Sequence, residues 1–550
     1  MSKIHKLTEE TVSAIAAGEV IERPAHVVKE LIENALDAGA DEIEISIVDA
    51  GLTKIEVIDS GEGMSKDDLL LSFLPHTTSK LSSVEDLHKI GSLGFRGEAL
   101  SSICSVAQLS ISSRTKSANK GTKVEVKKGK VKTTSIGMRP GTRVVVSGLF
   151  KEIPARKKFL KTPLTEMRLI TDIVLAFVFG NLDVKFKLSH NNKTLIDETS
   201  NKFSDRVRSQ WGDDFFTHSL PIKKQLDLLK FSGAIGKPQL GSSSSQKLWI
   251  YINNRKVEDK IILSAVKEAF GPLLMARSYP VGILFISVPK EFVDINVHPT
   301  KREVRFASPE SVFQEIKDAI LDLLTAHNLT YANTGIKSTA ANIRDELKQI
   351  VSESSVSKIG YVHSNEVLQI QQSYLISETE KGLQIIDQHA AHESLLYFEF
   401  LDNWEKKKAK KKSQSTQQPI IFETSASDAL AIEEDFEKIK SLGFKIEPFG
   451  KNTFRITRYP EFYSIHSEED IARELLDSLG NLNKMSSKQH LWLATLACKS
   501  AIKAGQFLTD VQKKQIVSAL TEKNYAYTCP HGRPVRIEIT LTYLARMFKR

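Results

Sequence analysis

The segment that most constrains this chain is KELIENALDAG at residues 29–39, in which polar side chains recur every three or four residues. In a helix this spacing gathers the polar side chains on one face and the apolar ones on the other. The polar face then holds Glu30, Glu33, Asn34 and Asp37. A carboxylate and an amide one turn apart suit a general base and a metal ligand. Taken alone, the segment also fits an amphipathic surface helix.

A second motif follows two predicted strands. Residues 43–47 alternate apolar and polar side chains, and the apolar residues of 55–58 lead into Asp59, which places that acid at a strand end. Gly61 and Gly63 allow the backbone to turn tightly beside it. A carboxylate there can accept a hydrogen bond from an exocyclic amine, and the glycines let a flat base approach. A plain hairpin is the alternative for this motif alone.

A third motif is a glycine-spaced loop, GFRG at residues 94–97, which opens onto a predicted helix over residues 98–106. Free backbone amides at a helix start attract phosphate, and Arg96 and Lys80 add positive charge. Gly141 and Thr142 then begin a valine-rich strand. The order of these motifs predicts a nucleotide pocket.

Composition narrows the class of protein. The 550 residues, 41% hydrophobic and 26% charged, predict several soluble domains. Only three cysteines occur, which argues against a disulfide framework and for a reducing compartment. The longest apolar stretch, residues 173–179, is too short to span a bilayer, and no hydrophobic signal region begins the chain. We therefore expect a cytoplasmic protein without membrane association.

The motifs KELIENALDAGA, DSGEGM, GFRGEAL and PGTRVVV resemble the GHKL ATPases. More narrowly, AAGEVIERPA at residues 16–25 and NVHPTKREV at residues 296–304 resemble the MutL family of mismatch-repair proteins. The resemblance runs over most of residues 1–330 and resumes in the C-terminal third. It implies an ATPase that uses ATP and Mg²⁺.

The resemblance also implies roles for individual residues. Glu30 would be the general base that orients water onto the γ-phosphate, and Asn34 would bind Mg²⁺. Asp59 would bind the adenine amine, and Lys301 would reach the γ-phosphate from a second subdomain. The remaining nucleotide-binding candidates are Asp37, Gly61, Gly63, Lys80, Gly94, Phe95, Arg96, Gly97 and Thr142. These roles agree with phosphoryl transfer, which needs an oriented nucleophile, a metal and cations.

The C-terminal third holds a second constellation of chemically active residues. A buried-type strand at residues 383–386 ends at DQHAAHE, residues 387–393, which opens a helix; CPHGRP lies at residues 529–534. Carboxylate, imidazole and thiolate ligands together favour zinc or a similar divalent ion. The set resembles the endonuclease site of MutL proteins that nick DNA. By that resemblance Zn²⁺ or Mn²⁺ would be held by Asp387, His389, Glu393, Cys529 and His531, with Cys498 nearby.

The chain departs from the family pattern at several positions. Asn254 stands where a glycine is usual before Arg255. Phe398 occupies the place of a second glutamate of the nuclease motif, with Glu399 one residue later, and Lys499 replaces an arginine. If the second glutamate supplies a ligand, Glu399 would have to replace it from a face of the helix turned by about 100°.

We expect a multidomain chain of α+β and α/β type. The predicted parts are a GHKL (Bergerat) ATPase sandwich at residues 1–210, an α/β transducer domain at 211–330, a linker at 331–362, and a C-terminal α/β dimerisation and endonuclease domain at 363–550. Strands are predicted near residues 248–252 and 281–288. The linker assignment depends on its Ser-, Thr-, Asn- and charge-rich composition.

The resemblance further implies a homodimer that binds double-stranded DNA and works with a mismatch-recognition protein of the MutS type. Arg255, Lys256 and Lys260 are the DNA candidates, and their contacts would be sequence-independent. QPIIF at residues 418–422 resembles peptides that dock on a sliding clamp, although a plain strand is the simpler interpretation.

Three functions are consistent with some of these motifs. The first is an ATP-switched mismatch-repair endonuclease. The second is a matchmaker clamp that binds ATP, DNA and other repair proteins but cuts nothing, with a structural metal site. A chaperone- or topoisomerase-like ATPase is disfavoured because the C-terminal motifs fit repair.

Overall fold

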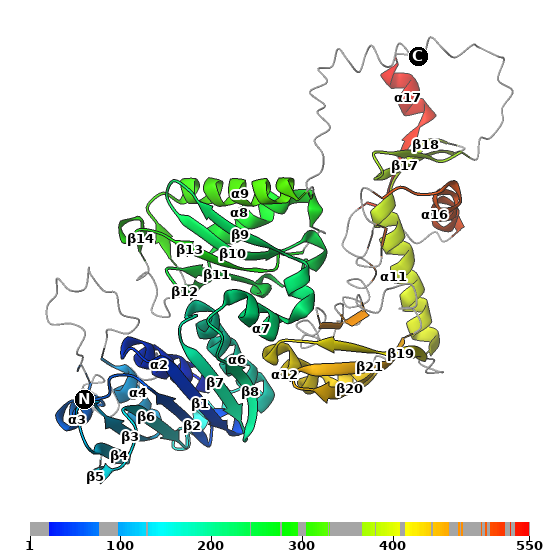
Figure 1. The fold of residues 1–550 in the computed structure, drawn as a ribbon. Helices are drawn as coiled ribbons and strands as arrows, with labels where there is room; N and C mark the ends of the chain where they lie inside the picture. The colour runs from blue at the N-terminus through cyan, green and yellow to red at the C-terminus, as the bar shows by residue number, and fades with distance from the viewer. Residues whose placement is uncertain are drawn as a thin grey trace, which may run out of the picture. The chain divides into compact units, whose positions relative to one another are not determined.

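The computed structural model describes residues 21–75, 77, 97–127, 130–242, 244–274, 278–294, 304–327, 329, 366–379, 381–407, 413–441, 444–460, 471–472, 475–476, 497, 501–502, 506–522, 529 and 534–548. The chain forms two compact units (Figure 1). The first comprises Met1–Leu329, Ile421–Phe436 and Pro448–Phe454, and the second comprises Thr330–Ile420, Glu437–Glu447 and Arg455–Arg550. Within the described residues, no helix combines the length and apolar character that crossing a bilayer requires.

The first unit is built on an eight-stranded sheet with the order β5-β4-β3-β6-β2-β1-β7-β8. Its neighbouring strands are antiparallel except for β1 and β7, which run parallel. The strands are β1 (Glu42–Val48), β2 (Lys54–Asp59), β3 (Gln108–Arg114), β4 (Gly121–Lys127), β5 (Lys130–Ile136), β6 (Gly141–Ser147), β7 (Lys185–His190) and β8 (Lys193–Glu198). The predicted strands before Asp59 and from Gly141 are confirmed.

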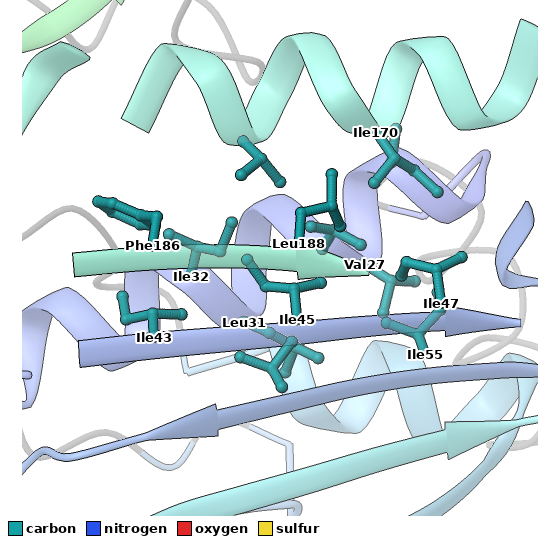
Figure 2. Packing of buried hydrophobic residues seen from close by; sticks show 14 of the residues in the cluster. Val27, Leu31, Ile32, Ile43, Ile45, Ile47, Ile55, Ile170, Phe186 and Leu188 are labelled. Carbon is teal, nitrogen blue, oxygen red and sulfur yellow. The ribbon is translucent and has the colours of Figure 1, made fainter. Parts of the chain in front are cut away.

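Helices α2 (Pro24–Asp37) and α6 (Pro163–Gly180) pack on this sheet and against each other. The period-two alternation of β1 buries Ile43, Ile45 and Ile47 against the apolar face of α2, as Figure 2 shows. The other helices here are α3 (Lys66–Leu71), α4 (Ala99–Val106), α5 (Pro154–Lys158) and α7 (Phe203–Thr217). The helices predicted around residues 29–39 and 98–106 are confirmed as α2 and α4.

A second sheet in the same unit has five strands in the order β12-β11-β13-β10-β9. Its strands are β9 (Ser219–Gln225), β10 (Lys230–Gly236), β11 (Leu248–Ile252), β12 (Arg255–Val257) and β13 (Gly282–Ser287). The predicted strands at 248–252 and 281–288 are therefore present, the latter one residue shorter at each end. Helices α8 (Lys260–Phe270) and α9 (Pro309–Ala326) pack together beside it, and β14 (Val293–Asp294) pairs with β15 (Arg305–Phe306).

Strand β11 is buried at every position because both of its faces are covered. Leu248, Ile250 and Ile252 join the core that includes α8 and α9. Trp249 and Tyr251 point the other way and join the core of the eight-stranded sheet. A continuous apolar strand is typical of a sheet covered on both sides. The second sheet is thus packed into the first unit. The predicted domain boundary near residue 210 falls inside helix α7. The division into ATPase and transducer domains stays a prediction.

The second unit contains a four-stranded antiparallel sheet with the order β16-β17-β18-β22. The strands are β16 (Leu368–Ile370), β17 (Tyr374–Thr379), β18 (Gly382–Asp387) and β22 (Arg536–Thr540), and the helices include α11 (Gln388–Lys407), α16 (Asp510–Glu522) and α17 (Leu541–Met547). The buried strand that ends at Asp387 and the helix that follows it are confirmed. The predicted linker, residues 331–362, lies outside the described residues.

The remaining elements of the C-terminal part are helices α12 (Ala426–Glu434) and α13 (Phe436–Ser441) and a three-stranded sheet. Its strands are β19 (Ser413–Glu423), β20 (Lys445–Gly450) and β21 (Thr453–Pro460), in the order β19-β21-β20. The candidate clamp peptide, residues 418–422, lies within β19, as the plain-strand interpretation expects.

Candidate functional site

Helix α2 carries the first candidate residues. Glu30, Asn34 and Asp37 are half-buried on it, whereas Glu33 is only 3% exposed. Glu33 pairs with Lys29 of the preceding turn, at 3.5 Å, and with Arg255 of β12, at 3.8 Å. The residues of the predicted polar face therefore fall into two groups. Glu33 makes structural ion pairs, while Glu30, Asn34 and Asp37 keep the partial exposure that a ligand site needs.

Asp59 ends β2 and is hydrogen-bonded to backbone amides of two neighbouring segments. Its Oδ1 accepts hydrogen bonds from the N–H of Gly61, at 2.9 Å, and of Thr142 on β6, at 3.2 Å. Burial raises the pKa of Asp59 to about 6, although these two amides lower it. A carboxylate held this way presents its second oxygen to a donor, as recognition of an exocyclic amine requires.

Close backbone approach requires glycine at two of the predicted nucleotide-site positions. Gly63 has φ of +74°, and a Cβ there would lie 2.2 Å from the carbonyl oxygen of Arg114. Gly97 at the start of α4 has φ of +61°, and its Cβ would lie 2.3 Å from the carbonyl oxygen of Thr77. These positions therefore need glycine for both conformation and space.

Ser113 of β3 is a site residue that the sequence analysis missed. It is 1% exposed; its Oγ accepts a hydrogen bond from the N–H of Met64, at 2.8 Å, and lies 2.9 Å from Oγ1 of Thr142. Ser113 thus ties the turn after Asp59 to β6. The sequence could have indicated Ser113, because it is a hydroxyl residue at a position where the alternation of β3 predicts a buried side chain.

The second candidate site lies at the start of α11. Asp387 is the residue before the helix, and its Oδ1 accepts a hydrogen bond from the N–H of Ala390, at 2.9 Å, in the manner of an N-cap. His389 Nδ1 lies 2.9 Å from the carbonyl oxygen of Ile502, whereas His392 Nδ1 accepts from the N–H of Ile502, at 3.0 Å. A hydrogen on His389 Nδ1 leaves Nε2 with its lone pair.

The remaining candidates on α11 differ in how far their side chains are buried. Glu393, one turn after His389, is 2% exposed, whereas Glu399 is exposed. Burial, together with the charge of His389, lowers the pKa of His392. Cys529 is 3% exposed and packs in the same core as Ala390 and Ala391. Asp387, His389, Glu393 and Cys529 thus belong to one region, but no three metal-ligating side chains gather into a site among the described residues.

Family models match three segments of the chain. Residues 22–142 match the histidine kinase-, DNA gyrase B- and HSP90-like ATPase, residues 207–325 match the C-terminal domain of a DNA mismatch repair protein, and residues 367–508 match the MutL C-terminal dimerisation domain. A DNA mismatch repair protein MutL from Clostridium botulinum is 33% identical over 669 residues, with all of both chains covered. The chain belongs to the MutL family. Another MutL, from Methanothrix thermoacetophila, is 34% identical over 569 residues, again with all of both chains covered.

Solved structures similar to this MutL-family chain cover its N-terminal part. The crystal structure of the N-terminal domain of a DNA repair protein is 28% identical, with a TM-score of 0.49, over 58% of this chain and 99% of that one. The Aquifex aeolicus MutL ATPase domain complexed with ADP is 26% identical, with a TM-score of 0.37, over 49% of this chain and 93% of that one.

The MutL family assignment confirms the GHKL-type ATPase region and the C-terminal dimerisation region. Several predicted site residues lie outside the described residues: Lys80, Gly94, Phe95, Arg96, Lys301, Cys498 and His531. Of the DNA candidates, Lys260 is exposed, Lys256 has its Nζ 3.5 Å from the ring centre of Trp249, and Arg255 faces Glu33 with 16% of its side chain exposed. DNA contact stays a prediction for all three residues.

Proposed function

We propose that this MutL-family chain is an ATP-switched mismatch-repair endonuclease. ATP binding and hydrolysis close two N-terminal halves around DNA, and closure licenses metal-dependent nicking by the C-terminal part. The observation that carries the nuclease half is the arrangement at α11, where Glu393 is buried one turn after a histidine whose Nδ1 is engaged by a backbone carbonyl.

In the ATPase step we assign Glu30 as the base that orients the attacking water and Asn34 as a ligand of Mg²⁺. Asp59 accepts the adenine amine beside Gly61 and Gly63. Lys80, the loop at residues 94–97 and Lys301 stabilise the phosphates, and Asp37 and Thr142 complete the pocket. The half-buried face of α2 and the buried Asp59 carboxyl support this division, because phosphoryl transfer depends on positioning and charge more than on covalent chemistry.

In the C-terminal part we assign Asp387, His389, Glu393, Cys529 and His531 to a Zn²⁺ or Mn²⁺ site bordered by Cys498. The carboxylate, imidazole and thiolate donors suit these ions, and the carbonyl that engages His389 Nδ1 is the usual way to orient a ligating ring. A bound metal would activate water and neutralise the scissile phosphate.

Homodimer formation is supported by apolar side chains left exposed on the second unit. They include Leu368 and Ile370 on β16, Ile537 on β22, and Leu541, Met547 and Phe548 in and beside α17. Apolar surface that a subunit leaves uncovered is available for association. The further partners that we propose are double-stranded DNA, through Lys256 and Lys260, and a mismatch-recognition protein of the MutS type; a sliding clamp is a further candidate.

A non-cutting matchmaker is the second candidate. Phe398 replaces the second glutamate of the nuclease motif, and the neighbouring Glu399 is exposed, whereas Glu393 is buried. Glu399 therefore does not share the buried side of α11 with Glu393. In this alternative the metal would be structural and other proteins would cut.

The deciding experiment follows conversion of supercoiled plasmid to open circles with Mn²⁺, with and without ATP. We expect nicking by the wild type and its loss in Asp387→Asn. Asparagine is as good an N-cap as aspartate, so this change removes the charge and keeps the helix start. Glu399→Gln, on the exposed side of α11, is the matched control and should nick normally. No nicking by the wild type would establish the matchmaker, and normal nicking by Asp387→Asn would remove the metal assignment.

A further inference from the structure

The second sheet of the first unit contacts helix α6 at the turn between β11 and β12. Ile252 pairs with Arg255, so Asn253 and Asn254 form a two-residue turn, with φ of 48° and 65°. Left-handed values at both positions are typical of the type I′ hairpin turn, which asparagine tolerates. Asn254 therefore replaces the usual glycine without disturbing the hairpin.

This turn is held firmly on both sides. The Asn253 side chain donates to the carbonyl oxygen of Val288 and accepts from its N–H, both at 3.0 Å. Tyr251 Oη donates to the carbonyl oxygen of Ala176 on α6, at 3.0 Å. At Gly180, the last residue of α6, a Cβ would lie 2.8 Å from the carbonyl oxygen of Asn254. The hairpin is thus in direct contact with the end of α6.

Arg255 follows the turn and extends toward α2. Its Nη2 lies 3.8 Å from Oε1 of Glu33, which is an ion pair without a hydrogen bond. Burial lowers the pKa of Arg255, while the nearby charges of Glu33, Glu30 and Asp37 raise it. A guanidinium remains charged under these conditions. Arg255, with 16% of its side chain exposed, therefore pairs with Glu33 of α2, and the charges of Glu30 and Asp37 on the same helix also act on it.

We propose that Arg255 is a positioning residue for ATP hydrolysis, which pairs with Glu33 and so ties the β11–β12 hairpin to the helix that carries Glu30 and Asn34. This inference rests on the proposed roles of Glu30 and Asn34. Arg255 contributes no contact to the proposed adenine site at Asp59, so its loss should spare substrate binding. It should instead lower the turnover rate, because the alignment of Glu30 with the reacting phosphate matters in the transition state.

The test measures steady-state ATP hydrolysis by the full chain and its variants. We expect Arg255→Gln and Glu33→Gln each to lower kcat about tenfold at nearly unchanged KM, and the double variant to lose no more than either single one. Arg255→Lys should recover part of the rate because it keeps the charge. Lys317→Gln breaks another ion pair of the second sheet region, with Glu268 at 2.6 Å, and should leave kcat unchanged.

Two outcomes would overturn the proposal: wild-type kcat in either glutamine variant, or losses that multiply in the double variant. If Arg255→Gln does not fold, Glu33→Gln and Arg255→Lys decide by the same criteria. The proposed base is tested separately by Glu30→Ala. Loss of hydrolysis in Glu30→Ala together with wild-type kcat in Arg255→Gln would reject the positioning role alone. Normal hydrolysis in Glu30→Ala would reject the base assignment on which the role depends.

Discussion

The Asp59 carboxylate accepts a hydrogen bond from the backbone N–H of Thr142, at 3.2 Å, across the neighbouring strands β2 and β6. The two residues are paired in the sheet register although 83 positions separate them in the chain. Desolvation of this half-buried carboxyl raises its pKa to about 6, although the hydrogen bonds from the amides of Gly61 and Thr142 lower it. The adenine candidate thus titrates close to neutral pH.

The first prediction concerns the pH dependence of ATP binding. Charged Asp59 accepts the adenine amine better than the neutral acid, so ATP affinity should fall as the pH drops through about 6. Calorimetric titration with ATP measures the effect. A range of about pH 5 to pH 8 covers at least one pH unit on either side of this pKa. Asp59→Asn should bind weakly with no such dependence, and an equally pH-dependent Asn variant would contradict the assignment.

The raised pKa of Asp59 also makes the stability of the fold depend on pH. The pKa of Asp59 in the folded state lies above the ordinary value of 3.8 for an aspartate, so the charged form is disfavoured in the folded state. The contribution of Asp59 to the free energy of unfolding should therefore rise as the pH falls from about 6 toward 3.8. Comparing denaturant midpoints of the wild type and Asp59→Asn across this range isolates the contribution.

A second prediction concerns the proposed base. Glu30→Ala should keep ATP affinity but lower hydrolysis about 100-fold or more, because the attacking water loses its orienting carboxylate. Phosphate release under saturating ATP measures the rate, and calorimetry measures affinity. Glu44→Ala removes an exposed carboxylate from β1 and should hydrolyse ATP normally. Wild-type turnover in Glu30→Ala would disprove the role.

A third prediction concerns a buried arginine that the sequence analysis did not single out. Arg206 is fully buried, and its guanidinium donates to the carbonyl oxygens of Val178, Asn181, Leu182, Val184 and Ser200. Arg206→Met should lower the free energy of unfolding by about 3 kcal/mol, because several buried carbonyls lose their donor.

Urea denaturation tests this expectation against Arg208→Met. Arg208 lies two residues along α7 with 57% of its side chain exposed, paired with Asp213. An exposed ion pair contributes about 1 kcal/mol or less, so the control should change stability little. Equal losses in the two variants would mean that the carbonyl contacts of Arg206 are not its main contribution.

A fourth prediction concerns the glycine at the start of α4. Gly97→Ala combines a left-handed residue with a Cβ placed 2.3 Å from the carbonyl oxygen of Thr77. It should cost about 1–3 kcal/mol of stability and weaken ATP binding, because the loop and helix start must shift. Gly137→Ala is the control, since its Cβ meets nothing within 4 Å and Gly137 has no positive φ. Unaltered melting and ATP affinity in Gly97→Ala would refute the expectation.

Local patterns in the sequence predicted much of the nucleotide region correctly. The spacing of Glu30, Asn34 and Asp37 predicted one helix face, and alternation predicted that Asp59 ends a strand; α2 and β2 confirm both. The start of β6 at Gly141 and the helix after Asp387 were predicted in the same way. These features depend on side chains a few residues apart, so periodicity and turn residues suffice to locate them.

What the sequence by itself determined is therefore the family and the helices and strands named above, whereas the roles assigned to individual residues stay a prediction. Only the tertiary structure decided that Glu33 is buried and pairs with Arg255, that Ser113 supports the turn after Asp59, and that Arg206 is buried. The family resemblance predicted a DNA contact for Arg255, but no local pattern in the sequence indicated its ion pair with Glu33. The physical reason is that each of these contacts joins residues far apart in the sequence. Sheet register and helix packing bring them together, and the local spacing of residues does not encode either.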